Sequence, residues 1–244
     1  MFTPDIQLNN ETLAAAIKAE LGFEFTSPIG CAGGKAKQAR FLTTLMPSQV
    51  DHFFEPFGGG MSMTYFLIHA GHVEAQNCHV GDLHDPILNF HRTLRDEYER
   101  LSLTLLGTRS IHGNGTRELF HQAVDVINNS DDNFDKAWAY YIFNHLSMLN
   151  FRKYRNSAFA PSILVYGGGV THHMVLRLPY LGALFRGVSI KKRSYKHALE
   201  EAMKLNDKSF LFLDPPYEGF AKSMYNAKTD FDFDEFAERC SAAS

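Results

Sequence analysis

The chain has 244 residues, of which 45% are hydrophobic, and it carries a formal net charge of −3. This length can bury a substantial core in one domain, or in one domain with a sizeable insertion. No apolar stretch approaches the roughly 18 residues of a membrane span, and the start of the chain lacks the basic and apolar regions of a signal peptide. These features argue against membrane-spanning and exported proteins and favour a cytoplasmic one.

The three cysteines, Cys31, Cys78 and Cys240, are scattered and form no CxxC pair. We expect reduced thiols rather than a disulfide framework or metal ligands. The adjacent His172 and His173 have no HExxH motif or Cys/His cluster around them, so no metal site is predicted.

Basic residues are unevenly distributed along the chain. The segment from Lys136 to Leu199 contains ten Lys or Arg residues and no Asp or Glu, whereas acids gather elsewhere, for example at Asp230, Asp232 and Asp234. Phosphate binding depends on a local basic face more than on net charge, so this segment is a candidate nucleic-acid interface.

Two helices are expected before residue 46. Capping residues at Asn9–Thr12 precede a short amphipathic helix that ends at Gly22, and a second helical stretch follows Lys35. Ahead of this second helix, Gly33-Gly34-Lys35 offers close backbone approach, N–H donors and a positive charge. It is not a P-loop, because no Ser or Thr follows Lys35. The helical residues are Leu13, Ile17 and Leu21 in the first stretch, and Leu42 and Leu45 in the second.

A strand, glycine-rich turn and helix are predicted from Val50 to His69. The apolar strand runs into Gly58-Gly59-Gly60, and the helix begins at Ser62. This unit lets a nucleotide-like ligand approach the backbone. The next strand, Cys78–Asp82, ends in an acid about 20 residues beyond the glycines, an offset typical of a carboxylate that binds ribose hydroxyls. The two strands together indicate an adenosine-containing ligand.

The middle of the chain is predicted to be largely helical. Pro86–Leu106 reads as a charged helix with Leu88, Leu94 and Leu101 in the core, and Thr108–Asn133 as a polar, turn-rich stretch. From Phe134, apolar and aromatic residues recur at helical spacing and predict a core-facing helix rather than an aromatic platform. They are Trp138, Tyr141, Ile142, His145, Leu146 and Leu149.

The stretch Asn150–Ser157 interleaves three cations with aromatic residues, a composition that suits contact with phosphates and base edges. A solvated surface loop is the alternative. The glycine triplet at 167–169 predicts a flexible loop, and Val188–Lys191 is a third strand candidate.

A fourth strand, Phe210–Leu213, leads into Asp214-Pro215-Pro216-Tyr217. Proline cannot donate to a ladder, so this strand stops abruptly, and Asp214 and Tyr217 lie at its carboxyl end, where open α/β sheets bind ligands. Asp214 and the carbonyl of Pro215 could hold the two protons of an exocyclic amine, making its nitrogen more nucleophilic, while Tyr217 stacks on the base. A turn with an incidental acid remains the alternative.

The chain contains four motifs, in the order Gly33-Gly34-Lys35, Glu55–Ser62, Gly81–Ile87 and Asp214–Tyr217. Their order resembles that of the Dam-like DNA adenine-N6 methyltransferases, and the resemblance covers residues 29–225. The resemblance implies an α/β fold with a Rossmann-like, S-adenosylmethionine-dependent methyltransferase sheet and a mostly helical, inserted target-recognition region. The cofactor-binding domain would comprise residues 1–90 and 186–244, and the inserted region residues 91–185.

The resemblance also implies roles for individual residues. Asp214, Pro215, Pro216 and Tyr217 would be catalytic and hold a flipped adenine. S-adenosylmethionine would be surrounded by Gly34, Lys35, Glu55, Phe57, Gly58, Gly59 and Asp82, although packing of Phe57 under the glycine turn is an equal alternative. The residues that would contact double-stranded DNA are Asn150, Arg152, Lys153 and Arg155.

The chain departs from the family pattern at two positions. Cys31 stands where the family commonly has an aromatic residue, so one stacking contact with the cofactor would be absent. Arg193-Ser194-Tyr195 stands where an acid or small polar residue is frequent, which makes Tyr195 a candidate wall of the adenosine pocket.

The family sheet normally continues past the DPPY tetrapeptide. The sequence ends at Ser244 and contains only four of the expected strands. We therefore expect a sheet that is truncated after the DPPY strand, as in a shortened reading frame or fragment. The 210–213 strand would then expose an apolar edge, through which a homo-oligomer could form.

The sequence thus predicts a site-specific DNA adenine-N6 methyltransferase, bacterial or phage-encoded, that uses S-adenosylmethionine on double-stranded DNA. The alternatives are a catalytically silent DNA-binding remnant and, among enzymes, an N4-cytosine methyltransferase. The recognition sequence cannot be read from these residues.

Overall fold

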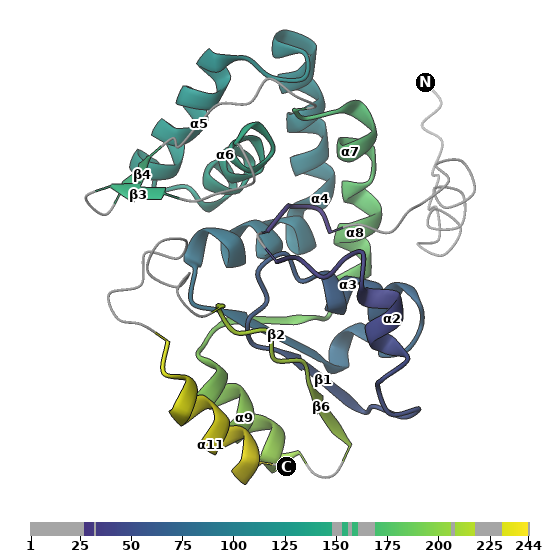
Figure 1. Cartoon of the computed structure of the whole chain (residues 1–244). Helices are drawn as coiled ribbons and strands as arrows, with labels where there is room; N and C mark the ends of the chain where they lie inside the picture. Colours follow the sequence, from purple (N-terminus) through teal and green to yellow (C-terminus); the bar gives the residue numbers. More distant parts are fainter. Residues whose placement is uncertain are drawn as a thin grey trace, which may run out of the picture.

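The computed structural model describes residues 27–31, 33–147, 153–155, 158–160, 169–205, 208–217 and 231–243. Its centre is a sheet of four parallel strands in the order β5-β2-β1-β6 (Figure 1). The strands are β1 (His52–Glu55), β2 (Cys78–Asp82), β5 (Ser189–Lys192) and β6 (Ser209–Leu211). An all-parallel sheet joined by helices is an α/β fold, as expected from the alternation of strands and helices.

Side chains of β1 point alternately to the two faces of the sheet. Phe53 is fully buried in the larger core, whereas the adjacent Phe54 lies in a small second core with Ala198 and Ala202 of α9 (Tyr195–Lys204). Strand period 2 explains this division, and burial on both faces explains why β1 reads as an apolar run.

Strand β6 lies at the edge of the sheet and pairs with β1, so Phe210 is opposite Phe53. The ladder continues beyond β6, because the N–H of Phe212 donates to the carbonyl of Phe54 at 2.8 Å. The strand predicted at 210–213 is therefore present in this edge position.

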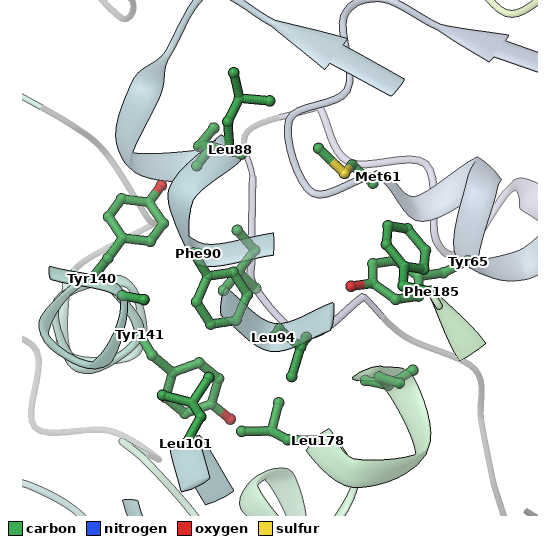
Figure 2. Packing of buried hydrophobic residues seen from close by; sticks show 14 of the residues in the cluster. Met61, Tyr65, Leu88, Phe90, Leu94, Leu101, Tyr140, Tyr141, Leu178 and Phe185 are labelled. Carbon is green, nitrogen blue, oxygen red and sulfur yellow. The ribbon is translucent and has the colours of Figure 1, made fainter. Parts of the chain in front are cut away.

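The larger core is built by helices on the Phe53 face. They are α2 (Ala39–Thr43), α3 (Ser62–His69), η1 (Ala75–Asn77), α4 (Asp85–His112), α5 (Arg117–Asn129), α6 (Asn133–Leu146), α7 (His172–Leu176) and α8 (Leu178–Leu184). Figure 2 shows Phe90 of α4 beside Tyr140 and Tyr141 of α6, and the rings of Phe90 and Tyr141 are stacked with centroids 5.7 Å apart. The buried Leu88, Leu94 and Leu101 confirm the core positions predicted for this helix.

Helix α4 is longer than the predicted Pro86–Leu106 and bends at Glu97, where φ is −134° and ψ is 32°. It carries the chain from the sheet into the group of helices that contains α5 and α6 (Figure 1). Residue 90, the expected end of the first part of the cofactor domain, falls inside this helix, and the division into domains stays a prediction.

The prediction of a turn-rich stretch at 108–133 is wrong, because α5 occupies Arg117–Asn129. The Thr116 hydroxyl caps it by accepting from the N–H of Leu119 at 3.1 Å. Leu119, Ala123 and Ile127 recur every four residues and are buried against the core. The polar residues that suggested turns occupy the opposite, exposed face of an amphipathic helix.

Other predicted elements fall close to the observed ones. Helix α6 buries Tyr141, Ile142 and Leu146, as a core-facing helix should. The second predicted helix is short: α2 includes Leu42 but ends before Leu45. The helix expected at residues 9–21, Leu149, and the first two glycines of the 167–169 triplet lie outside the described residues.

Two smaller elements complete the described chain. Strands β3 (Lys153–Arg155) and β4 (Ala158–Ala160) form an antiparallel pair. Helix α11 (Phe233–Ala242) packs beside α9 (Figure 1). Among the described helices, none combines the length and apolar character that crossing a membrane requires.

Candidate active site

All four strands of the sheet run in one direction, so their carboxyl ends share one edge. Glu55 ends β1, Asp82 ends β2, and Asp214 follows β6 by three residues. Because β1 lies between β2 and β6, the motifs that the sequence places far apart meet at this edge. This is the edge where open α/β sheets bind their ligands.

The glycine turn after β1 is held against β2. The N–H of Gly58 donates to the carbonyl of Gly81 at 2.7 Å. A Cβ atom on Gly58 would lie 2.9 Å from that carbonyl oxygen, and Gly59 has a φ of +47°. The first position therefore needs glycine for close approach, and the second needs it for its left-handed backbone.

Asp82 holds this turn through one carboxylate oxygen and its own chain after β2 through the other. Oδ2 accepts from the N–H of Gly59 at 2.9 Å, and Oδ1 accepts from the N–H of His84 at 2.8 Å. Each carboxylate oxygen keeps a second acceptor site, so a ligand hydroxyl could still bind. Asp82 thus supports the turn, a role that the sequence analysis did not consider.

Glu55 is buried beneath the same turn. It is only 4% exposed and accepts hydrogen bonds from the backbone N–H and the hydroxyl of Thr64. Burial raises the pKa of Glu55 to about 7, against the lowering effect of the two Thr64 bonds, and the charge of Asp214 adds to the increase. This carboxyl group therefore keeps its proton to a higher pH than an exposed glutamate does.

Met61 adopts an unusual conformation at the end of the turn. It is fully buried, has a φ of +54° and precedes the first residue of α3. A left-handed conformation in a non-glycine residue stores strain and is frequent at functional sites. Sequence reasoning missed this position, whose only signal is its place directly after three glycines.

Lys35 joins the glycine-lysine segment to the tetrapeptide after β6. Its ammonium nitrogen lies 2.5 Å from Asp214 Oδ2, 3.1 Å from the Tyr217 hydroxyl and 2.7 Å from the Gly33 carbonyl oxygen. Burial lowers the pKa of Lys35, but hydrogen bonds and charge attraction from Asp214 and Tyr217 outweigh it, so the pKa is raised. Lys35 is therefore a cation in contact with two of the expected catalytic residues.

The backbone around Lys35 allows this contact. Gly33 has a φ of +74°, and a Cβ atom there would lie 3.1 Å from the Tyr217 hydroxyl oxygen. The N–H of Gly34 closes a turn onto the Cys31 carbonyl at 3.0 Å. Pro215 and Pro216 are half-buried, whereas the side chain of Tyr217 is 54% exposed and open to a stacking partner.

Phe57 and Tyr195 lie together at the other side of the glycine turn. Their rings are stacked 5.6 Å apart, and Phe236 of α11 meets both rings edge to face. Lys196 of α9 pairs with Glu235 of α11 at 2.5 Å. The rings of Phe57 and Tyr195 thus form a single surface, because a centroid distance of 5.6 Å leaves no room for another flat ring between them.

Leu83 is an exposed apolar residue that the sequence analysis overlooked. It follows Asp82 directly and is 66% exposed. An apolar side chain at the carboxyl end of a strand, beside the glycine turn, offers a surface for a flat base. Its signal in the sequence was its place immediately after the acid of β2.

The basic segment is less positive on the surface than its composition indicates. Four of its cations form ion pairs with acids from elsewhere in the chain. These pairs are Lys191–Glu201, Lys192–Asp85, Arg193–Glu201 and Lys196–Glu235. Parallel pairing of β5 with β2 brings Asp85 to Lys192, which no count along the sequence could reveal.

The residues expected to contact DNA are only partly described. Asn150 and Arg152 lie outside the described residues, whereas Lys153 and Arg155 are the ends of β3. Their assignment to DNA stays a prediction. Within the described part of the chain, no group of three or more His, Cys, Asp or Glu side chains could hold a metal ion.

The sheet is parallel, with a glycine turn after one strand, an acid after the next and an Asp-Pro-Pro-Tyr sequence at the same edge. These features place the chain among the open α/β proteins, whose ligand crevice lies at the carboxyl ends of the strands. The model of the family described as D12 class N6 adenine-specific DNA methyltransferase matches residues 32–243. The chain belongs to this family of transferases, which confirms the resemblance stated for its motifs. No curated protein matches the chain.

Proposed function

We propose that the chain moves a methyl group from S-adenosylmethionine to N6 of an adenine that has been turned out of duplex DNA. The observation that carries this proposal is the contact of Lys35 with Asp214 and Tyr217, which joins two motifs beside the glycine turn. Base, cofactor and catalytic residues can then meet at one edge of the sheet.

The residues at this edge fit an adenosine-containing cofactor. Gly58 and Gly59 keep backbone close to the strand ends, Asp82 retains acceptor sites, and the exposed Leu83 offers an apolar surface. Gly34, Lys35, Glu55, Phe57 and Tyr195 complete the proposed cofactor set. When bound, S-adenosylmethionine supplies a methyl group on a positively charged sulfur.

Asp214 would hold the target amine. Its carboxylate and the carbonyl of Pro215 are acceptors for the two N–H groups of N6, and two acceptors favour the pyramidal nitrogen that attacks. As the new N–C bond forms, the bond between the methyl carbon and the sulfur would break, with its electron pair left on sulfur. Positive charge develops on N6, and the nearby carboxylate stabilises that charge. One N6 proton would then pass through the Asp214 carboxylate to solvent, leaving the secondary amine.

The base must leave the helix before it reaches Asp214. Unstacking costs a few kcal/mol. The exposed Tyr217 ring could offset part of this by stacking on the extruded base, since base–aromatic stacking contributes about 1–3 kcal/mol. Asn150, Arg152, Lys153 and Arg155 are proposed to contact the duplex.

The test is transfer of tritium from methyl-labelled S-adenosylmethionine to unmethylated DNA, followed by identification of the labelled nucleoside. We expect N6-methyl-2′-deoxyadenosine from the wild type and none from Asp214→Ala, with unchanged binding of S-adenosylhomocysteine. Asp234→Ala, at an exposed position of α11, is the matched control and should remain active.

Other outcomes point to the alternatives. Label in N4-methylcytosine would identify a cytosine methyltransferase. A folded chain that binds DNA but neither transfers label nor binds S-adenosylhomocysteine would be a silent DNA-binding remnant. Retained adenine methylation in Asp214→Ala would remove Asp214 from the mechanism.

A further inference from the structure

The central residue of the glycine turn is held through both of its backbone polar groups. The N–H of Gly59 donates to Asp82 Oδ2 at 2.9 Å, at the end of β2. The Gly59 carbonyl oxygen lies 3.2 Å from Nε2 of His91, a fully buried residue of α4. Gly59 has a φ of +47°, and glycine has many accessible conformations, so these two contacts select one of them.

The partners of His91 determine which of its ring nitrogens carries the proton. A carbonyl oxygen only accepts, so Nε2 must donate to Gly59. In the neutral ring Nδ1 is then an acceptor, and the Tyr65 hydroxyl lies 3.1 Å from it. Burial raises the pKa of Tyr65 well above its ordinary value, so this hydroxyl keeps the proton that it donates. The contacts therefore specify the Nε2–H tautomer of His91.

Aromatic packing restricts the imidazole ring further. The ring of Phe185, which follows α8, is stacked on that of Tyr65 with centroids 3.6 Å apart, and the two lie side by side in Figure 2. The centroid of the His91 ring lies 6.1 Å from that of Phe185. A buried histidine with satisfied nitrogens is often purely structural. Here one partner is the turn itself, so the same contacts connect the core to the ligand edge of the sheet.

The Gly59 carbonyl also sets the direction of the next N–H group. The two polar groups of a trans peptide unit point to opposite sides, so the N–H of Gly60 faces away from His91. Among the described residues, none accepts a hydrogen bond from this N–H. A donor that is held in place before a ligand arrives reduces the conformational entropy lost on binding. The orientation of this one peptide unit therefore affects ligand affinity.

We propose that His91 is a positioning residue for the cofactor, which holds the Gly59 carbonyl through its Nε2–H group and so keeps the glycine turn in its binding conformation. Because His91 is fully buried, it acts through Gly59 and not by contact with the cofactor. This inference rests on the proposed function and adds to it a residue of α4 that lies outside the four motifs.

Two substitutions of similar length separate hydrogen bonding from packing. His91→Gln retains an amide N–H that can reach the Gly59 carbonyl, whereas His91→Met has no donor. Calorimetric titration with S-adenosylhomocysteine should give His91→Gln an affinity within about threefold of the wild type. His91→Met should bind about tenfold more weakly, the loss expected for one hydrogen bond. Equal losses in both variants, or an unchanged affinity in His91→Met, would overturn the inference.

Leu105→Met is the matched control for this comparison. It places the same side chain at another fully buried position of α4, beyond the bend at Glu97. An exchange of Leu for Met conserves volume, so the affinity for S-adenosylhomocysteine should equal that of the wild type. A loss as large as that of His91→Met would assign the effect to general loosening of α4 and would contradict the role of His91.

Steady-state kinetics provide a readout that loosening alone would not give. His91 acts on the bound conformation of the turn, which the ground state and the transition state share. His91→Met should therefore raise the KM for S-adenosylmethionine about tenfold and leave kcat nearly unchanged. A reduced kcat at an unchanged KM would place His91 in the chemical step and would argue against positioning of the turn.

The tautomer of His91 can be observed without any ligand. Long-range proton–nitrogen correlation NMR on protein with isotope-labelled histidine distinguishes Nε2–H from Nδ1–H, and the His91→Gln variant identifies the signal. We expect Nε2–H for His91. An Nδ1–H tautomer could not donate to Gly59, so that result would refute the inference whatever the cofactor affinity.

These outcomes separate the two proposals. If the folded wild type binds no S-adenosylhomocysteine, the proposed use of S-adenosylmethionine fails and the role of His91 fails with it. If the wild type binds it and methylates adenine while His91→Met behaves in the same way, only the inference about His91 is wrong.

Discussion

Two acids at neighbouring strand ends occupy different environments. Asp82 is partly exposed and its carboxylate accepts from two backbone N–H groups, whereas Glu55 is buried and its pKa is raised to about 7. Both residues end a strand, so the sequence alone suggests similar roles. Burial under the glycine turn distinguishes them.

The pKa of Glu55 predicts how stability changes with pH. It rises from 4.5 to about 7 on folding, so the folded protein binds more protons than the unfolded chain between these values. The contribution of Glu55 to the free energy of unfolding is therefore fully present below about pH 4.5, and it is lost as the pH rises through about 7. The free energy of unfolding should fall by up to about 3 kcal/mol over this range.

Glu55→Gln isolates this effect, since its amide oxygen can still accept from the Thr64 N–H. Urea unfolding of wild type and variant at about pH 5 and pH 8 gives the comparison. We expect the wild type to lose stability relative to the variant as the pH increases. A constant difference between the two proteins would mean that Glu55 titrates normally.

Gly58 should not tolerate a side chain. In Gly58→Ala the new Cβ atom meets the Gly81 carbonyl oxygen at 2.9 Å, and a backbone oxygen cannot rotate away. We expect a loss of about 1–3 kcal/mol in the free energy of unfolding, as for an overpacked core, and weaker binding of S-adenosylhomocysteine.

Gly107→Ala is the control for this substitution. Gly107 lies in α4, and a Cβ atom there would meet nothing within 4 Å. Alanine in an unhindered helix position should stabilise by about 0.5–1 kcal/mol. Equal stability of both alanine variants would contradict the steric explanation.

At the scale of elements, α11 depends on a small aromatic cluster. Phe236 contacts Phe57 and Tyr195 edge to face, while the Lys196–Glu235 pair is half-exposed and contributes little. The apolar contacts therefore hold this helix beside the glycine turn.

Phe236→Ala should loosen α11 without unfolding the sheet. Phe236 is half-buried, so we expect a cost of about 1–2 kcal/mol, below the ~3–5 kcal/mol of a fully buried phenylalanine. Hydrogen exchange should speed up in α11 and remain unchanged in β1. Glu238→Ala, at an exposed position of the same helix, is the control, and equal acceleration there would argue against the cluster.

At the scale of the whole molecule, β6 is the edge of the described sheet. It pairs with β1 through Phe53 and Phe210, and the half-buried Leu213 follows at the end of the strand. An apolar edge of this kind can pair with another chain. Association of two copies along residues 210–213 therefore stays a prediction.

Light scattering after size-exclusion chromatography tests this association. We expect a mass near twice 27.6 kDa at high concentration, decreasing on dilution. Leu213→Lys, which places a charge on the edge, should shift the protein to the monomer. A wild-type monomer at every concentration would contradict pairing through this strand.

Much of the fold and of the site could be predicted from local patterns. The four strands, α3, α4 and α6 have apolar runs or helical spacing that identify them, and the glycines and prolines mark where strands end. Helix α5 was missed although Leu119, Ala123 and Ile127 recur at helical spacing, because the polar residues between them resemble turn signals. Their common burial shows that these positions form the inner face of an amphipathic helix.

The sequence by itself determined the order of the motifs and the family, because turn chemistry and hydrophobic periodicity act over a few neighbouring residues. Only the tertiary structure decided which charged groups meet. Lys35 and Asp214 are 179 positions apart, and Lys192 and Asp85 are 107 apart. Such pairs form because the strand order β5-β2-β1-β6 aligns carboxyl ends at one edge, a property of the whole sheet that no local pattern encodes.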